Sequence, residues 1–474
     1  NYELGKDVSD QFKNKETFRV DENALKKDTN FWSSTRPIPL TEEEQKDYIQ
    51  KDSLRQIWDS RAFKDSMDRK NNEFTWIKIL TGYSRQNTFK NTELSFPSPL
   101  STVRFNAVEG FKLSFNAIWE QSDSMYRKWT IHPVIEFGFS DKIFKPRISV
   151  SYRFDNYNQG IISLNAGRQN QQFEPREPIT ERNNSWNSLW NKRNNIRLFQ
   201  NEFIVLSATK EISNGIYLGI STSYTYRKPV SVNTQYSIRK KDEQYAENIA
   251  RTDLPMDVYA ANKYWQNKVT LRIRPFQKYS SYPYVKIRNN SEGPRIMLEY
   301  EDGIAIDKAS NDYHKLTLSV RDYRVNAKLL GYFSYNVEGG TALRSSPTYF
   351  GDYFHPMGNE LLSPIDPDLS SFNLLPYYEY SVDKYYAQCN LRHHFNGFVF
   401  DKIPLINKTP FKLVAGLSAL YVPGRGQYAE TLVGIENFRI GPFQLFNLDY
   451  TWAFDKNGFR DHGLTIRLSQ LFSN

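Results

Sequence analysis

Strand-length segments in which apolar and polar residues alternate recur along most of this chain, and they constrain its fold more than any other feature. In the clearest segment, residues 216–226, one face carries Ile216, Leu218, Ile220, Tyr224 and Tyr226, and the other carries Tyr217, Gly219, Ser221, Ser223 and Thr225. Successive side chains of a strand point to opposite faces, so this segment has one apolar and one polar side. Repetition of the pattern, with aromatic residues at the strand ends, is typical of a transmembrane β-barrel.

A soluble β-sandwich shows similar alternation, so strand length and composition must decide between the two architectures. The segments run for about 9 to 13 residues, which suits a tilted membrane strand better than the usual strand of about 5 to 6. Mean hydropathy is −0.66, and no stretch approaches the roughly 20 apolar residues of a transmembrane helix. We therefore predict an all-β chain that forms a transmembrane antiparallel β-barrel of about 16 strands.

The chain divides into a polar N-terminal region, residues 1–95, and the predicted barrel, residues 96–474. Thr41 and Glu44 match a capping box, which predicts a helix that runs to about Met67 in a short periplasmic or plug region. A surface helix with no special role is the alternative. Three long polar connections lie near residues 169–199, 228–263 and 337–382. Even numbers of expected strands separate them, so we expect all three outside a Gram-negative outer membrane, with both termini in the periplasm.

Charged residues recur on the polar faces of the expected strands and predict a charged lumen. The net charge is +9, but lysine and arginine are scattered, which argues against nucleic acid as a partner. Two interpretations stay open: a network of lumen salt bridges that satisfies itself, or a charged path for solute or polypeptide. The lumen candidates are Arg147, Arg153, Arg168, Arg272, Arg274, Glu436, Arg439, Asp449 and Arg467.

No motif in the chain predicts catalysis or a bound cofactor. The adjacent His393 and His394 would point to opposite faces of a strand, so they cannot bind one metal ion together. The sequence has neither a Gly-x-Ser-x-Gly elbow nor a phosphate-binding loop. We expect a protein that is not an enzyme and that has no catalytic residue, cofactor or metal site.

The run Lys384-Tyr-Tyr-Ala-Gln-Cys-Asn-Leu-Arg-His-His-Phe-Asn-Gly397 resembles a Bacteroidota outer-membrane family of unassigned function. The segment Arg36-Pro-Ile-Pro-Leu-Thr-Glu-Glu-Glu44 and the turn Val108-Glu-Gly110 are also similar to it. The resemblance implies a carboxypeptidase-regulatory-like β-sandwich ahead of the barrel, so we expect the chain to be part of a longer protein. The barrel is distantly similar to the BamA-like superfamily, whose 16-stranded barrels have a long loop between strands 11 and 12. The chain lacks the Val-Arg-Gly-Phe signature of that loop.

The 337–382 connection occupies the position of that loop and is too apolar for a solvated tether. We expect it to fold inward and occlude the barrel, with Arg344, Tyr349, Phe350 and Asp352 as its candidate contact residues. The alternative is a loop that docks on a neighbouring protein. By analogy of fold, we expect a component of outer-membrane protein or lipoprotein biogenesis or export. Its expected partners are other proteins and outer-membrane lipids, including lipopolysaccharide. The alternative function is a porin-like channel for solutes.

Overall fold

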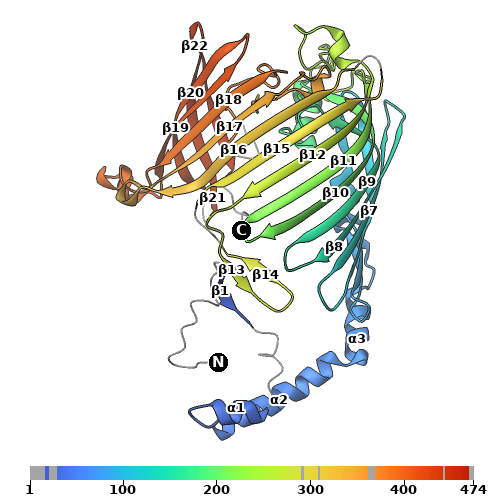
Figure 1. The fold of residues 1–474 in the computed structure, drawn as a ribbon, viewed down its shortest axis with the longest axis vertical. Helices are drawn as coiled ribbons and strands as arrows, with labels where there is room; N and C mark the ends of the chain where they lie inside the picture. Colours follow the sequence, from blue (N-terminus) through green and yellow to red (C-terminus); the bar gives the residue numbers. More distant parts are fainter. Residues whose placement is uncertain are drawn as a thin grey trace.

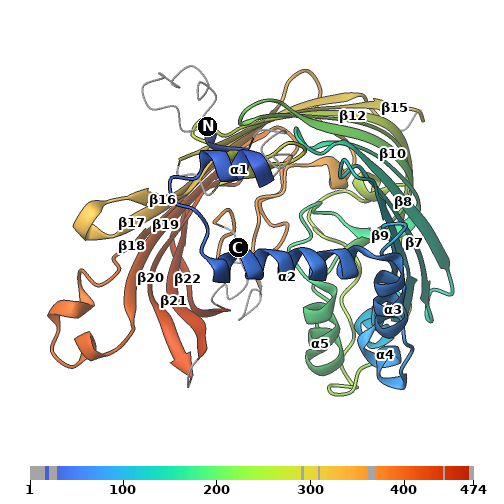
Figure 2. The same cartoon turned by 90° about the horizontal axis from the view of Figure 1, so that it is seen from below.

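The computed structural model describes residues 16–20, 29–289, 293–307, 310–360, 369–440 and 443–468. Most of its strands belong to one large antiparallel sheet that curves around a central space (Figure 1 and Figure 2). The predicted all-β class is confirmed. The long strands are β7 (Lys128–Gly138), β8 (Phe144–Asp155), β9 (Gly160–Gln172), β10 (Leu198–Ser213), β11 (Ile216–Pro229), β12 (Asn262–Ile273), β15 (Arg295–Ala305), β16 (Tyr313–Asn326), β17 (Tyr332–Ala342), β18 (Tyr385–His394), β19 (Lys412–Val422), β20 (Gly426–Ile440), β21 (Phe443–Asp455) and β22 (Gly458–Leu468).

The alternation in residues 216–226 places apolar side chains outside and polar side chains inside the curved sheet. Ile220 of β11 lies opposite Val269 of β12, and these side chains are 52% and 40% exposed. Ser221, Ser223 and Thr225, on the other face of β11, line a cavity on the inner side. Period-two alternation therefore predicts correctly which face of this strand is the inner one.

The N-terminal edge of the sheet consists of short strands. They are β2 (Tyr83–Asn87), β3 (Thr92–Phe96), β4 (Arg104–Asn106), β5 (Gly110–Asn116) and β6 (Ile118–Ser122). Apolar residues alternate through residues 111–119 as they would in one uninterrupted strand, but the strand breaks at Ala117, whose N–H donates to the carbonyl of Pro133 in β7. Proline has no N–H to return that bond, so the ladder is interrupted there. The sheet begins at Tyr83, ahead of the boundary near residue 95 that we expected.

The strands from β7 to β22 pair antiparallel with their neighbours along the sheet. Within the described ranges, no strand pair joins β22 to the short strands of the opposite edge. A closed barrel of about 16 strands therefore stays a prediction.

All three long connections lie at the same ends of the strands, on one side of the sheet, as we expected. They join β9 to β10, β11 to β12, and β17 to β18, and the first contains the helix α5 (Glu181–Asn191). One aromatic residue from each connection meets the other two: the ring centroid of Phe173 lies 5.6 Å from that of Tyr259 and 5.3 Å from that of Phe350. The three connections therefore meet at one end of the strands, and their position outside a membrane stays a prediction.

A small separate sheet lies at the other ends of the strands, beside the short turns (Figure 1). It consists of β1 (Glu16–Arg19), which is parallel to β13 (Tyr279–Ser281), and of β14 (Lys286–Arg288), which is antiparallel to β13. The hydroxyl of Tyr279 accepts a hydrogen bond from the N–H of Gly215, and Lys286 forms an ion pair of 3.0 Å with Glu211. These contacts hold the small sheet against the turn between β10 and β11.

The N-terminal helices are α1 (Thr29–Thr35), α2 (Glu42–Asp59), α3 (Arg61–Asn71) and α4 (Trp76–Thr81). The expected capping box at Thr41 and Glu44 is present at the start of α2. The expectation of one helix to Met67 is wrong, because Ser60 is extended and its hydroxyl caps α3 by accepting from the N–H of Phe63. Seen from below, α2 crosses the view beneath the sheet (Figure 2). None of the helices in the described residues is long and apolar enough to span a membrane.

Candidate functional site

The connection between β17 and β18, residues 343–384, is the centre of the candidate site, and we call it the long loop. One part packs on the inner faces of β18 to β21, where Phe372 and Leu375 are fully buried against Leu420 and Tyr428. Another part, around the 3-10 turn Phe350–Asp352, packs against the first two long connections and β10. The long loop therefore connects two distant parts of the curved sheet across its interior.

A buried ion pair joins the long loop to β11. A terminal guanidinium nitrogen of Arg227 lies 2.6 Å from a carboxylate oxygen of Asp352, and both side chains are almost completely buried. Gln266 of β12 donates to the other Asp352 oxygen at 3.2 Å, and Lys315 of β16 donates to the Asp352 carbonyl at 2.9 Å. The ring of Tyr349 lies 4.9 Å from the guanidinium carbon of Arg227. Three strands thus position a single loop residue, and burial makes loss of either charge costly.

A second polar contact holds the C-terminal part of the long loop. The backbone N–H groups of Asn373 and Leu374 donate to the carboxylate of Glu430 in β20, at 2.7 and 2.8 Å. The side-chain oxygen of Asn373 accepts from Arg467 of β22 at 2.7 Å. Arg467 also forms an ion pair of 2.9 Å with Asp449 of β21. Here the loop backbone supplies hydrogen-bond donors and the sheet supplies the acceptor.

A third contact links the long loop to the first long connection. Arg176 forms an ion pair of 2.8 Å with Glu174 and donates to the carbonyl of His355 at 2.6 Å. The Nδ1 atom of His355 lies 2.7 Å from the hydroxyl of Ser381, so the two ends of the long loop meet here. Burial lowers the pKa of His355 to about 4, and the positive charge of Lys315 also lowers it, although Glu174 opposes the shift. The imidazole is therefore neutral at pH 7.

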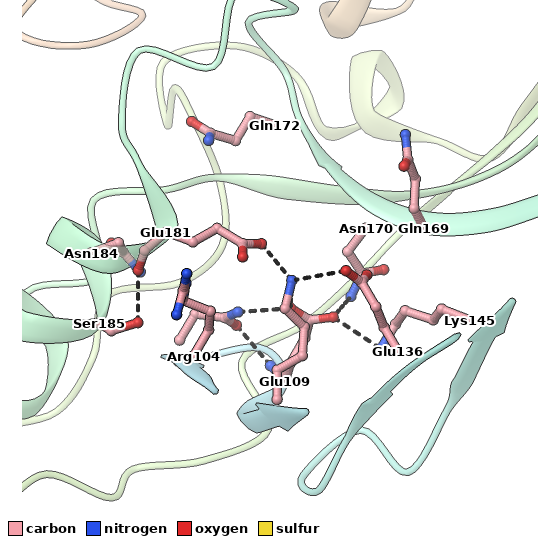
Figure 3. A network of polar contacts seen from close by, with 12 residues as sticks. Arg104, Glu109, Glu136, Lys145, Gln169, Asn170, Gln172, Glu181, Asn184 and Ser185 are labelled. Atoms are coloured by element: carbon pink, nitrogen blue, oxygen red, sulfur yellow. Dashed lines mark hydrogen bonds and ion pairs between the residues drawn. The ribbon is translucent and has the colours of Figure 1, made fainter. Parts of the chain in front are cut away.

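A second charged cluster lies where the short N-terminal strands meet α5 (Figure 3). Glu109 forms an ion pair of 2.9 Å with Lys145, and Lys145 pairs with Asp141 at 2.5 Å. Lys112 pairs with Glu181 of α5 and lies 3.7 Å from Glu109. Glu109, Lys112 and Lys145 are nearly inaccessible to solvent. A cavity of about 650 Å³ adjoins the cluster, and its lining includes Lys112, Glu136 and Glu181.

The sequence did not indicate Glu109, Asp141 and Lys145 as site residues, although Glu109 lies in the turn Val108-Glu-Gly110, which resembles the family. Asn106 accepts hydrogen bonds through its side-chain oxygen from the N–H groups of Val108 and Glu109, which fixes this turn. A buried glutamate in a turn has no periodic signal, because its partners come from other strands. The available signal in the sequence was Asn106 itself, because asparagine side chains often form hydrogen bonds with the backbone two residues further on and so favour turns.

The structure brings together some predicted lumen charges. Asp449 pairs with Arg467 at 2.9 Å, and the guanidinium of Arg392 lies 3.5 Å from the same carboxylate. Arg147 lies 3.3 Å from Glu136, and Glu436 lies 3.0 Å from His394.

Alternation places Arg153 on the face of β8 that carries Arg147, and Arg272 on the face of β12 that carries Lys268. Arg153 donates to Asn156 at 3.5 Å and Arg274 to Gln277 at 3.5 Å, both beside the short turns. Arg272 has no ion-pair partner among the described residues, and it is exposed. The side chain of Arg439 lies outside the described part of the chain.

The expectation that Arg168 faces the lumen is wrong. Arg168 lies opposite Glu202 in the strand pair of β9 and β10, and the two form an ion pair of 2.8 Å. Glu202 shares its face of β10 with Ile204, which is 55% exposed on the outer side of the sheet. Near the long connections the outer face also becomes polar, so polarity alone does not identify the inner face there.

Three of the four candidate contact residues of the long loop are buried where we expected contacts. Tyr349, Phe350 and Asp352 all pack in the interior. Arg344, the fourth candidate, is exposed, and the described residues provide no ion-pair partner for it. Arg344 follows β17 directly, before the loop turns inward. His393 and His394 contact different groups, the Leu330 carbonyl and Glu436, on opposite faces as expected.

We expect the Arg227–Asp352 pair to be strongly coupled. Asp352→Asn should leave Arg227 buried without a counter-charge and destabilise the docked loop by about 3–5 kcal/mol. The double variant Arg227→Met/Asp352→Asn should lose much less stability than the sum of the losses in the two single variants. Stability is measured by urea unfolding in detergent and loop docking by limited proteolysis. The exposed pair of Lys51 with Asp47 is the control, where Asp47→Asn should cost less than about 1 kcal/mol. Additive effects of Arg227→Met and Asp352→Asn on the free energy of unfolding would contradict the coupling.

Docking of the long loop should weaken in acid because of His355. Its folded-state pKa of about 4 lies below the ordinary value of 6.5, so the undocked state binds a proton more readily. The stabilisation is complete above pH 6.5 and is lost as the pH falls towards 4, by about tenfold in the docking equilibrium per pH unit. Proteolysis of the long loop by an acid-tolerant protease should rise over this range in the wild type. A His355→Asn variant with the same steep profile would show that another group is responsible.

The chain matches the model of one protein family and resembles several solved structures. The family model is described as the C-terminal domain of a family of unknown function (DUF5686), and it matches residues 77–435. No curated protein matches the chain. The structure of BamA from Haemophilus ducreyi lacking POTRA domains 1-3 has 9% identity and a TM-score of 0.39, and the match covers 85% of this chain and 77% of that one.

Two further solved structures are similar at the same low level. CdiB from Acinetobacter baumannii has 11% identity and a TM-score of 0.34, with 75% of this chain and 56% of that chain covered. A mutant of Rh. blastica porin has 8% identity and a TM-score of 0.28, with 77% and 94% covered. Similarity this weak carries no information about activity. The family match, in contrast, spans more than half of the chain, and the protein belongs to the family of unknown function DUF5686 through its C-terminal domain.

Proposed function

We propose that the protein is a non-enzymatic outer-membrane β-barrel of about 16 strands whose long loop closes the lumen. The outer face of the sheet supports a membrane location. Nearly every long strand exposes at least one large aliphatic side chain there, for example Ile135, Ile148, Leu164, Ile204, Ile220, Val269, Leu298, Leu318, Val337, Leu391, Leu417, Val433 and Leu464. A soluble monomer rarely exposes an apolar surface of this extent, whereas lipid tails would cover it.

The proposed role is in the biogenesis or export of outer-membrane proteins or lipoproteins, together with partner proteins. The observation that carries it is the set of contacts that fix the long loop to both sides of the sheet, from Arg227 on β11 to Glu430 on β20. A passive pore needs an open path, whereas a loop fixed across the lumen closes it until something displaces it. In this proposal a client or partner displaces the loop. The long connections face outward, towards lipopolysaccharide, and both termini lie in the periplasm.

A porin-like channel is the second candidate. Its support is the charge of the inner face, where Lys268 pairs with Glu299 at 3.0 Å and with Glu301 at 3.2 Å. The same ion pairs are also expected in an interior whose charges neutralise one another and which binds no solute. Depletion of the protein in cells separates the two functions. A loss of surface lipoproteins or other barrels with unchanged permeability supports biogenesis, and reduced solute uptake with normal assembly supports the channel.

The membrane location predicts unequal effects for neighbouring substitutions on β11. Ile220→Arg, on the outer face, should destabilise the protein in lipid by about 2–4 kcal/mol, because a charge would enter the hydrocarbon layer. Ser221→Arg, on the inner face, should cost less, since its side chain reaches the polar interior. After reconstitution in lipid, the stability of each variant is measured from the urea concentration at which its folded, heat-modifiable band is lost on a gel. Equal costs for the two variants, or a monomer that stays soluble without detergent, would contradict the proposal.

Removal of the long loop should open the lumen. Replacing residues 345–370 with a short glycine–serine linker removes Asp352 and its contacts, so single-channel conductance in planar bilayers should rise well above that of the wild type. The matched control shortens the connection at the opposite edge, residues 400–406, and should leave the conductance unchanged. If both proteins show the same near-zero conductance, another segment closes the lumen and the proposed role of the loop is wrong.

A further inference from the structure

The helix α4 and the strand β2 that follows it lie at the N-terminal edge of the large sheet. Among the residues that the structure describes, β2 pairs with β3 and with no other strand. The side-chain nitrogen of Asn72 donates to the carbonyl of Gln86 in β2, and its side-chain oxygen accepts from the N–H of Gln86, both at 2.7 Å. These are the two hydrogen bonds that a neighbouring strand would make. Asn72 therefore blocks this part of the free edge against the addition of a strand.

Strand register places the end of α4 level with the middle of the sheet. Tyr83, the first residue of β2, lies opposite Phe96 of β3. Ser95, next to Phe96, lies opposite Ile118 of β6. The residue before Ile118 donates its N–H to the carbonyl of Pro133, at the middle of β7. Because α4 connects the blocked edge with this level, it runs beside β2 and not beyond the ends of the strands.

The exposure of the side chains along α4 is the reverse of that expected in water. Four apolar side chains are 41–83% exposed: Trp76, Ile77, Ile79 and Leu80. Lys78, the only charged residue of the helix, is half-buried. A helix that is apolar on all sides lies in a protein core or in a membrane. The exposed fractions show that α4 is not in the core of this chain.

The half-buried Lys78 folds back along the chain, away from the apolar side chains. Its ammonium group donates to the carbonyls of Asn71 and Glu73, at 3.0 and 2.5 Å, and lies 5.6 Å from the ring centroid of Tyr83. Both carbonyls precede α4. A lysine at the border of a membrane behaves in this way, because its aliphatic stem follows the apolar surface while its charged end reaches polar groups.

Side-chain hydroxyl groups bind carbonyls at the C-terminal end of α4. The hydroxyl of Thr81 donates to the carbonyl of Ile77 at 3.1 Å. The hydroxyl of Ser98 donates to the carbonyl of Leu80. The last carbonyls of a helix often bind water, whereas in hydrocarbon the protein itself must supply their partners. These two bonds suit a helix end that has little access to water.

We propose that residues 74–82 are embedded in the hydrocarbon of the periplasmic leaflet, where lipid acyl chains cover the apolar side chains of α4. The proposal rests on the proposed membrane location, but it makes a separate claim about what covers this helix. Along this part of the edge, a helix in contact with lipid takes the place of a paired strand. The other possible covers are water, β22 and a partner protein, and the experiment below distinguishes them from lipid.

The test measures the surroundings of nitroxide spin labels on the full chain in lipid vesicles. The only cysteine is first removed by Cys389→Ser, and single labels are then attached to Ile77→Cys or Leu80→Cys. Ile220→Cys, on the outer face of β11, is the lipid reference, and Gln50→Cys, on the exposed surface of α2, is the water reference. Power saturation compares collisions with oxygen, which concentrates in hydrocarbon, and with a nickel chelate, which stays in water. Heat-modifiable migration confirms that each labelled protein is folded.

The ratio of oxygen to nickel accessibility at the Ile77→Cys and Leu80→Cys labels should match that at Ile220→Cys. It should exceed the ratio at Gln50→Cys by about threefold or more. A ratio like that of the water reference would overturn the proposal, and so would labels that neither reagent reaches, since β22 or another protein would then cover α4. Both results leave the membrane location intact as long as the Ile220→Cys label favours oxygen. If that label favours nickel, the membrane location itself is wrong and the proposal fails with it.

Discussion

The buried pair of Arg227 and Asp352 is the interaction on which the arrangement of the interior depends. A carboxylate and a guanidinium removed from water are stable only when each satisfies the other, and here both are almost completely buried. Because Asp352 belongs to the long loop and Arg227 to β11, the loop must reach the sheet for either charge to be tolerated. The aromatic cluster around Phe350 then follows from its position.

The contacts at the far end of the loop differ in kind from this pair. Glu430 receives two backbone N–H groups, from Asn373 and Leu374, instead of a cationic side chain. Such an arrangement recognises the path of the backbone more than the identity of its side chains. The long loop is thus held by a buried charge at Asp352, and by backbone N–H groups together with the Asn373 side chain in its C-terminal part.

The sequence predicted the regular parts of the fold because period-two alternation reports directly on burial. It identified the inner face of β11, the common edge of the three long connections and the inward path of the long loop. Prediction failed where one residue interrupts a pattern. Pro133 interrupts the strand at Ala117, and Ser60 ends one helix and caps the next. It also failed for Arg168, because the outer face becomes polar near the long connections. Glu109 and Lys145 were missed because their pairing joins segments far apart in the chain.

The central claim is that the long loop is part of the folded interior, and amide hydrogen exchange in lipid nanodiscs tests it most directly. The N–H groups of Asn373 and Leu374 are bonded to the Glu430 carboxylate. We predict that peptides covering residues 369–384 exchange as slowly as those of β20, on a scale of minutes to hours. Exchange of these amides at the rate of an unstructured peptide, with β20 still protected, would contradict the account.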